Sequence, residues 1–139
     1  MGMNIKAYLP AFGILVVIGI LHNIGGIVFN AYDVWWWDIL LHFLGGVWLA
    51  LSGFWFFYYS RFVKGFLRTA GRFFFATLVP VLIIGLAWEV FEYMFGLTFV
   101  LPGERWGVDT IGDVFVDIAG GMAVYLYYRL KYWIEFCKE

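Results

Sequence analysis

The chain has 139 residues, a formal net charge of −1 and a single cysteine, Cys137. This length suits one domain and is too short for two of ordinary size. Apolar residues make up 64% of the chain and charged residues 14%, against roughly half and a quarter in soluble domains, so we predict that membrane lipid covers part of the surface. The charge balance argues against a nucleic-acid partner, and one cysteine excludes a disulfide framework or a CxxC metal motif.

Four apolar stretches predict transmembrane helices, because each is close to the roughly 20 residues that cross about 30 Å of hydrocarbon. The predicted fold is an all-α bundle of four transmembrane helices that forms one integral membrane domain over residues 1–139. Pro80 lies inside the third stretch, where a proline is expected to kink the helix. The predicted helices cover residues 8–29, 38–59, 73–95 and 110–130.

The connections differ in their content of lysine and arginine. The two predicted outer connections hold one basic residue between them, Arg105, whereas the middle connection and the two ends hold all of the others. By the positive-inside rule, we predict a multi-pass membrane protein with both termini and the middle connection in the cytoplasm. Residues 65–72 are predicted to form a short interfacial helix. The basic residues of the middle connection and the two ends are Lys6, Arg61, Lys64, Arg68, Arg72, Arg129, Lys131 and Lys138.

One short pattern occurs twice. The segments that start at Asp38 and Asp113 both read D-x3-[HD]-x2-G-G, in two predicted helices that run in the same direction. Two interpretations stay open: a pair of helical hairpins related by an axis along the membrane normal, as in some transporters, or coincidence in a glycine-rich chain. In either case glycine has no Cβ and lets helices approach closely, so we expect both glycine pairs at helix–helix contacts.

Acidic and histidine side chains gather toward the predicted outer ends of the helices. At about 1.5 Å per residue they lie within roughly 12 Å of the outer boundary, and His22 on the first helix lies in the same layer. An ionisable group that faces lipid is costly, so these side chains should point toward one another. Spacings of three and four residues place them on shared helix faces: Asp38 with His42, Glu89 with Glu92, and Asp109 with Asp113 and Asp117.

We interpret this polar layer as a cation site, because clustered carboxylates repel one another unless protons or a metal neutralise them. Mixed imidazole and carboxylate ligands suit zinc, manganese or iron, and carboxylates alone suit magnesium or calcium. The predicted cofactor is therefore a divalent cation: zinc, manganese, magnesium or calcium. Its predicted ligands are Asp38, His42, Glu89, Glu92, Asp113 and Asp117.

Three other interpretations of the polar layer stay open. It could be a hydrogen-bonded network that only holds the bundle together, although apolar packing would achieve this at lower cost. It could be a proton relay, but the predicted cytoplasmic halves of the first three helices offer almost no ionisable groups to continue it. It could hold a haem between His22 and His42, which the many surrounding acids disfavour.

If the chain is an enzyme, the pattern predicts a metal-dependent hydrolase or transferase that acts on a lipid-linked or cell-envelope substrate. Glu89 would then be the general base. Arg105 either pairs with Glu104 or holds a phosphate or carboxylate above the acidic layer. The alternatives are a small proton- or cation-coupled transporter, an ion-conducting oligomer, or a membrane accessory subunit without chemistry of its own.

The spacing of these residues also resembles that of two related groups of small bacterial membrane proteins. Asp38-x3-His42, Glu89 late in the third helix, and Arg105 and Asp113 before a glycine-rich fourth helix resemble the VanZ-like family. The H-F, E-x2-E and D-x3-D elements are similar to those of the YjdF-like inner-membrane proteins. This sequence departs from the VanZ-like pattern at Ile39, where that family has a basic residue, and at Glu92, where glutamine is usual. The resemblance implies a role in the cell envelope and no established reaction, and with it we expect the chain in a bacterial or archaeal plasma membrane.

Overall fold

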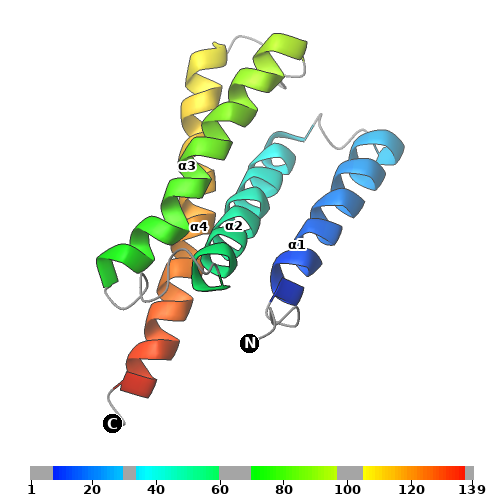
Figure 1. The fold of residues 1–139 in the computed structure, drawn as a ribbon. Coiled ribbons are helices and arrows are strands. Elements are labelled where there is room, and N and C mark those ends of the chain that lie inside the picture. The colour runs from blue at the N-terminus through cyan, green and yellow to red at the C-terminus, as the bar shows by residue number, and fades with distance from the viewer. Residues whose placement is uncertain (1–7, 30–33, 60–69, 97–104, 137–139) are drawn as a thin grey trace.

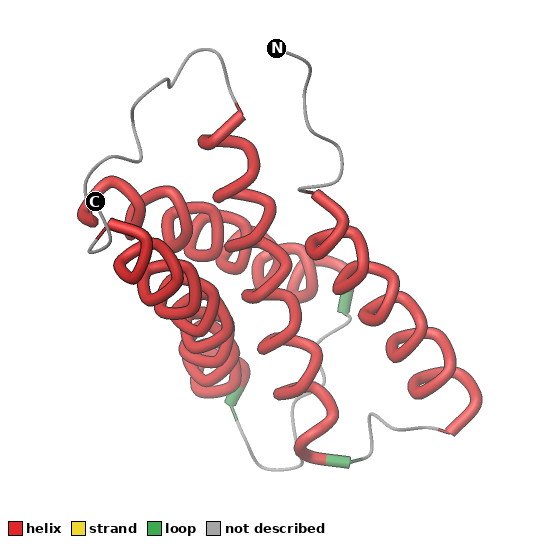
Figure 2. The backbone as a smooth tube through the Cα atoms, turned by 90° about the horizontal axis from the view of Figure 1, so that it is seen from below, coloured by secondary structure: helices red, strands yellow, loops and turns green. Residues whose placement is uncertain are grey.

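The computed structural model describes residues 8–29, 34–59, 70–96 and 105–136, and nearly all of them are helical (Figures 1 and 2). The predicted all-α class with four long helical segments is confirmed. The first segment consists of an α-helix and a π-helix that follows it without a break. Three of the four segments are long and apolar enough to cross a membrane, and the first is a shorter apolar helix. The elements are α1 (Leu9–Ile20), η2 (Leu21–Val28), α2 (Trp35–Tyr59), α3 (Ala70–Phe95) and α4 (Trp106–Phe136).

Three of the helices begin before the predicted starts. α2 and α3 each start three residues earlier, at Trp35 and Ala70, and α4 runs from Trp106 to Phe136. Hydropathy marks only the apolar middle of a helix, whereas the backbone hydrogen bonds continue into the polar interface. Most of the predicted interfacial helix over residues 65–72 lies outside the described residues, and its last three residues belong to α3.

α2 lies in the middle of the bundle. It packs against α1, α3 and α4, and α3 also packs against α4. α2 and α4 run in the same direction, and α1 and α3 run opposite to them, so α1 begins and α4 ends at the same end of the bundle (Figure 1). The apolar core includes Leu49 and Ala50 of α2, Val81 of α3 and Val124 of α4.

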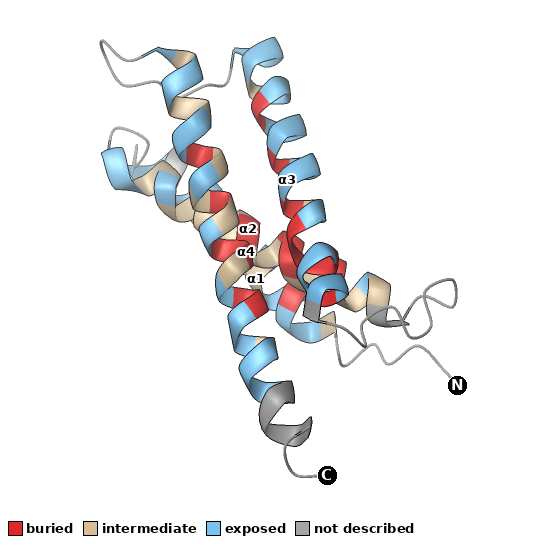
Figure 3. Cartoon of the chain, turned by 90° about the vertical axis from the view of Figure 1, so that its left-hand side faces the viewer, coloured by how far each residue is buried: buried red, intermediate tan, exposed pale blue. Residues whose placement is uncertain are grey.

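One side of α3 is buried at every helical turn, and its opposite side is exposed (Figure 3). Residues four apart lie on the same face of a helix, so the rotation that turns this face toward the bundle buries the whole row together. The last member of the row is a glutamate, which places a carboxylate inside the bundle. The row consists of Phe73, Thr77, Val81, Gly85 and Glu89.

Glycines set the distance between α2 and α4, as predicted from the repeated pattern. A Cβ at Gly46 would collide with the backbone of Asp117, and a Cβ at Gly120 would collide with the carbonyl of Phe43. The missing side chains therefore let the two backbones touch. The interpretation of both glycine pairs as helix-contact residues is confirmed for Gly46, Gly120 and also Gly121, which lies against Leu78 and Val81 of α3.

Pro80 lies inside α3, and the helix continues through it to Phe95. A proline has no backbone N–H, so the carbonyl of Ala76, four residues earlier, loses its usual helical partner. Gly53 of α2 lies against this site: a Cβ there would be 2.5 Å from Ala76 O and 2.7 Å from Pro80 Cγ. α2 thus covers the freed carbonyl, which would be costly to leave facing lipid.

The second half of the first helix is a π-helix rather than the continuous α-helix predicted from hydropathy. This segment, η2, carries His22 and Asn23, and the amide of Asn23 donates a hydrogen bond to Gly19 O over 2.7 Å. Gly25 lies directly against the indole of Trp37 at the start of α2. π-Helical turns are rare and often lie at functional sites.

Candidate functional site

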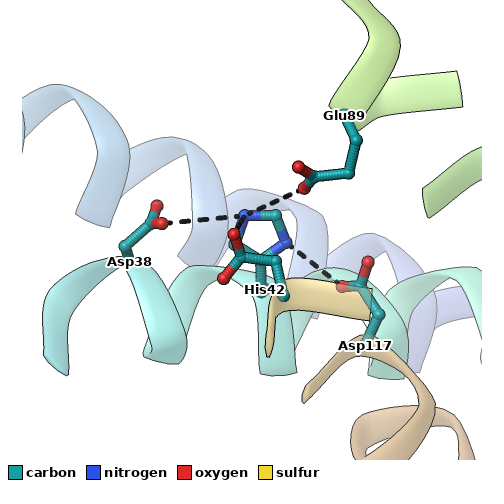
Figure 4. Close-up of polar contacts among 5 residues, drawn as sticks. Asp38, His42, Glu89 and Asp117 are labelled. Carbon is teal, nitrogen blue, oxygen red and sulfur yellow. Dashed lines mark ion pairs between the residues drawn. The ribbon is translucent and has the colours of Figure 1, made fainter. Parts of the chain in front are cut away.

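Three helices bring the six predicted ligands together, and Figure 4 draws His42 with the carboxylates that pair with it. Because α2 and α4 are parallel and touch through their glycines, their Asp-x3-His and Asp-x3-Asp segments lie side by side. α3 contributes the acidic end of its buried row from the opposite direction. We call this group the His42 cluster; it consists of Asp38 and His42 of α2, Glu89 and Glu92 of α3, and Asp113 and Asp117 of α4.

His42 lies at the centre of the cluster, with carboxylates on both sides of its ring. Its Nε2 atom is 3.9 Å from Asp38 Oδ2, 3.8 Å from Glu89 Oε1 and 4.0 Å from Asp113 Oδ2. Its Nδ1 atom is 3.6 Å from Asp117 Oδ1. These distances are longer than ordinary hydrogen bonds, so the carboxylates surround the imidazole at ion-pair distance. One imidazolium can offset only one of four negative charges.

The central residues are almost completely buried. Glu89 is 2% exposed, Asp117 5%, Asp113 6% and His42 7%. Glu89 points its carboxylate at His42 (Figure 4), and Glu89 Oε1 accepts no hydrogen bond from any described residue. A buried carboxylate oxygen without a partner is costly. Within the described part of the chain, the ion pairs of the cluster include no lysine or arginine, so the cluster is complementary to a positively charged ligand.

Two sets of three side chains have donor atoms close enough to hold one ion. One set is Asp38, His42 and Asp113, and the other is His42, Glu89 and Glu92; within each set the donor atoms lie within 4.8 Å of one another. The two sets share the imidazole, and the carboxylates around Nε2 come from three different helices. Asp117 belongs to neither set and lies alone on the Nδ1 side.

Other polar residues from the predicted layer lie outside this group. Arg105 is exposed and stands immediately before α4, about 10 Å along the helix axis from the level of Asp113, and its predicted partner Glu104 lies outside the described residues. Asp109 is half-buried in the first turn of α4. His22 is exposed on η2 and lines the same cavity as His42.

Gly85 is a site residue that the sequence analysis did not single out. A Cβ at this position would lie 2.7 Å from Asp117 Oδ2, so the glycine makes room on α3 for the carboxylate from α4. The sequence does contain one indication of this role: Gly85 lies four residues before Glu89, on the same face of the helix. The π-helical geometry of η2, by contrast, has no counterpart in the hydropathy pattern.

A cavity of about 370 Å³ opens beside the His42 cluster. Residues of α1, η2, α2 and α3 form most of its wall, and Asp117 adds one side chain from α4. Most of the wall is apolar. The ionisable side chains that line it are His22, Asp38, His42, Glu92 and Asp117.

Comparison with known proteins gives one family. Residues 5–132 match the family described as predicted membrane protein (DUF2238). The match covers most of the chain, and the chain therefore belongs to this family of membrane proteins, in agreement with the membrane character predicted from its composition. Neither a curated protein nor a solved structure matches the chain.

Proposed function

We propose that this member of the family binds a divalent cation in the His42 cluster. The observation that carries the proposal is the buried Oε1 atom of Glu89, which has no hydrogen-bond partner among the described residues and lies 3.8 Å from His42 Nε2. Carboxylates of Asp38 and Asp113 surround the same nitrogen. A divalent ion near Nε2 would offset the repulsion between these carboxylates. It would also give their oxygen atoms a partner, because the interior of a membrane has no water to bind them.

The two sides of the imidazole have different roles in this proposal. Nε2 faces the ion together with carboxylates from α2, α3 and α4. Asp117 lies 3.6 Å from Nδ1, at ion-pair distance, and a small approach would let its carboxylate accept the ring N–H and hold the imidazole in the orientation that a metal ligand needs. We therefore assign Asp117 as a positioning residue, and Gly85 as the residue that makes room for it.

We further propose that the site faces the outer side of a bacterial or archaeal plasma membrane, in a multi-pass protein with both ends in the cytoplasm. The basic middle connection supports this orientation. α1 begins and α4 ends at the same end of the bundle (Figure 1), which agrees with both ends of the chain lying on one side of the membrane. The resemblance to VanZ-like and YjdF-like proteins supports a role in the cell envelope. The proposed substrate is lipid-linked or belongs to the cell envelope, because the site lies within helices that are proposed to span the membrane.

The test is a thermal-unfolding titration of detergent-purified protein with zinc, manganese, magnesium and calcium, at neutral and mildly acidic pH. The ion that binds should raise the melting temperature by mass action, and the gain should shrink in acid because the ligands must be deprotonated. Glu89→Gln should abolish the gain. Glu135→Gln is the matched control, because it makes the same change in α4, about 30 Å along the helix from the cluster.

The proposal is wrong if no ion raises the melting temperature at either pH and the purified protein carries no stoichiometric metal. Protons alone would then neutralise the carboxylates, and the His42 cluster would be a proton-sharing network.

A further inference from the structure

The cavity beside the His42 cluster combines a polar end with long apolar walls. Leu15 and Ile18 of α1, Trp48 of α2, and Ile84 and Trp88 of α3 contribute to these walls. The volume of about 370 Å³ lies within the roughly 300–1,000 Å³ typical of ligand pockets. A wholly polar ligand would leave these walls without a matching surface, whereas an alkyl chain would cover them.

The cavity lies where the bundle is least tightly closed. α1 packs against α2, and α1 and α3 face each other across the cavity. Side chains on both sides of this gap remain exposed: Leu15 is 39% exposed, and Ile84 and Trp88 are each 47% exposed. In a membrane protein such apolar surface faces lipid, so the gap between α1 and α3 gives an alkyl chain a lateral path from the bilayer.

Each of the two candidate ligand sets is open toward this cavity. Asp38, His42 and Glu92 line the cavity, whereas Asp113 and Glu89 are not part of its wall. An ion held by either set therefore has a carboxylate behind it and faces the cavity in front. Three protein ligands leave at least one coordination position for a further donor, and that donor must come from the cavity side.

We propose that the cavity binds an amphiphile with a phosphate headgroup and an alkyl chain. A phosphate oxygen completes the coordination of the divalent cation at the His42 cluster, and the chain lies along the apolar walls between α1 and α3. Phosphate oxygens are common ligands of hard divalent cations, and the cation links this anionic headgroup to a cluster that would otherwise repel it. This inference rests on the proposed cation site and names its substrate class.

The experiment measures how tightly the full chain binds Mn²⁺ in nanodiscs of an uncharged glycolipid that contains no phosphate, from the electron paramagnetic resonance signal of free Mn²⁺. The probes are dodecyl phosphate, inorganic phosphate and dodecyltrimethylammonium, and empty nanodiscs with the same additives give the background. Dodecyl phosphate should tighten Mn²⁺ binding about tenfold, within the range usual for two coupled ligands. Inorganic phosphate at the same concentration, which has no chain, should change it little.

Two glycines of α1 provide a matched pair of variants. A Cβ at Gly13 or at Gly19 would meet no atom within 4 Å, and only Gly19 belongs to the cavity wall. Gly19→Leu should fill the cavity, keep the Mn²⁺ affinity measured without amphiphile, and lose the tightening by dodecyl phosphate. Gly13→Leu should keep both properties.

Several outcomes would overturn this inference, and they separate it from the cation proposal. If Mn²⁺ binds equally well with and without dodecyl phosphate, the cation site stands and the amphiphile does not. If Gly19→Leu still shows the tightening, the chain lies elsewhere. If dodecyltrimethylammonium, and not dodecyl phosphate, tightens Mn²⁺ binding, the cavity binds an amphiphile with a cationic headgroup. If neither Mn²⁺ nor any of the other three ions binds to the unmodified protein, both proposals are overturned.

Discussion

His42 of α2 and Asp117 of α4 lie 3.6 Å apart, Nδ1 to Oδ1, at the point where glycines let the two helices touch. Gly46, one turn beyond His42, lies against the backbone of Asp117, and Gly120 lies against the carbonyl of Phe43. The glycine pairs that hold the bundle together therefore also set the geometry of the site. A change in this packing should alter the cation affinity even though glycine itself binds nothing there.

The first prediction concerns this coupling. Gly46→Ala places a Cβ against the backbone of Asp117, and backbone cannot move aside as a flexible side chain does. We expect a loss of roughly 1–3 kcal/mol in the free energy of unfolding, seen as a lower melting temperature in detergent, together with weaker cation binding. Gly112→Ala in α4 is the control, because a Cβ there would meet no atom within 4 Å. Equal melting temperatures for the two variants would contradict the predicted contact.

The second prediction is that the cluster acts as one unit. Glu89→Gln removes the negative charge that Glu89 places 3.8 Å from His42 Nε2, and Asp117→Asn weakens the group that orients the imidazole. Loss of such an orienting partner typically costs about 10- to 100-fold in metal affinity. The double variant should lose little more than the worse single variant, because residues that act together give non-additive effects. Isothermal titration calorimetry with the ion that binds measures the affinity of the two single variants and of the double variant. Mild and additive losses of affinity would mean that the residues act separately.

The third prediction is proton release. Without the cation, carboxylates so close together cannot all be ionised, so binding of a divalent ion must displace protons. Affinity should therefore fall as the pH is lowered, since protons compete with the ion for the same oxygens. A pH-indicator dye in weakly buffered solution would record the release when the ion is added. If the ion binds without releasing protons and with equal affinity in mild acid, the cluster is already fully ionised and this charge argument is wrong.

The fourth prediction tests the orientation in the membrane. In a Cys137→Ser background, a cysteine at Lys64 in the middle connection should be shielded in intact cells from a membrane-impermeant thiol reagent. A cysteine at Glu104 in the connection before α4 should react readily. Permeabilised cells, in which both positions should react, control for local access. Ready labelling at position 64 in intact cells would place the middle connection and both termini outside, and the His42 cluster near the cytoplasm.

The sequence alone determined the features that depend on residues close together in the chain. Apolar stretches predicted the helical segments, because membrane helices must satisfy their backbone hydrogen bonds internally. Spacings of four placed Asp38 with His42 and Asp113 with Asp117 on shared faces. The positions of these residues along their helices placed the site residues in one layer, because the rise per residue is constant.

Only the tertiary structure decided how the helices are rotated and which of them touch. Nothing local places His42 at the centre of the cluster, or puts Asp117 at Nδ1 while three other carboxylates surround Nε2. The role of Gly85 and the cavity between α1 and α3 are likewise visible only in the folded chain. These features arise from contacts between residues far apart in the sequence, where the absence of one Cβ decides how closely two helices approach. Hydropathy and spacing within a single helix carry no information about such contacts.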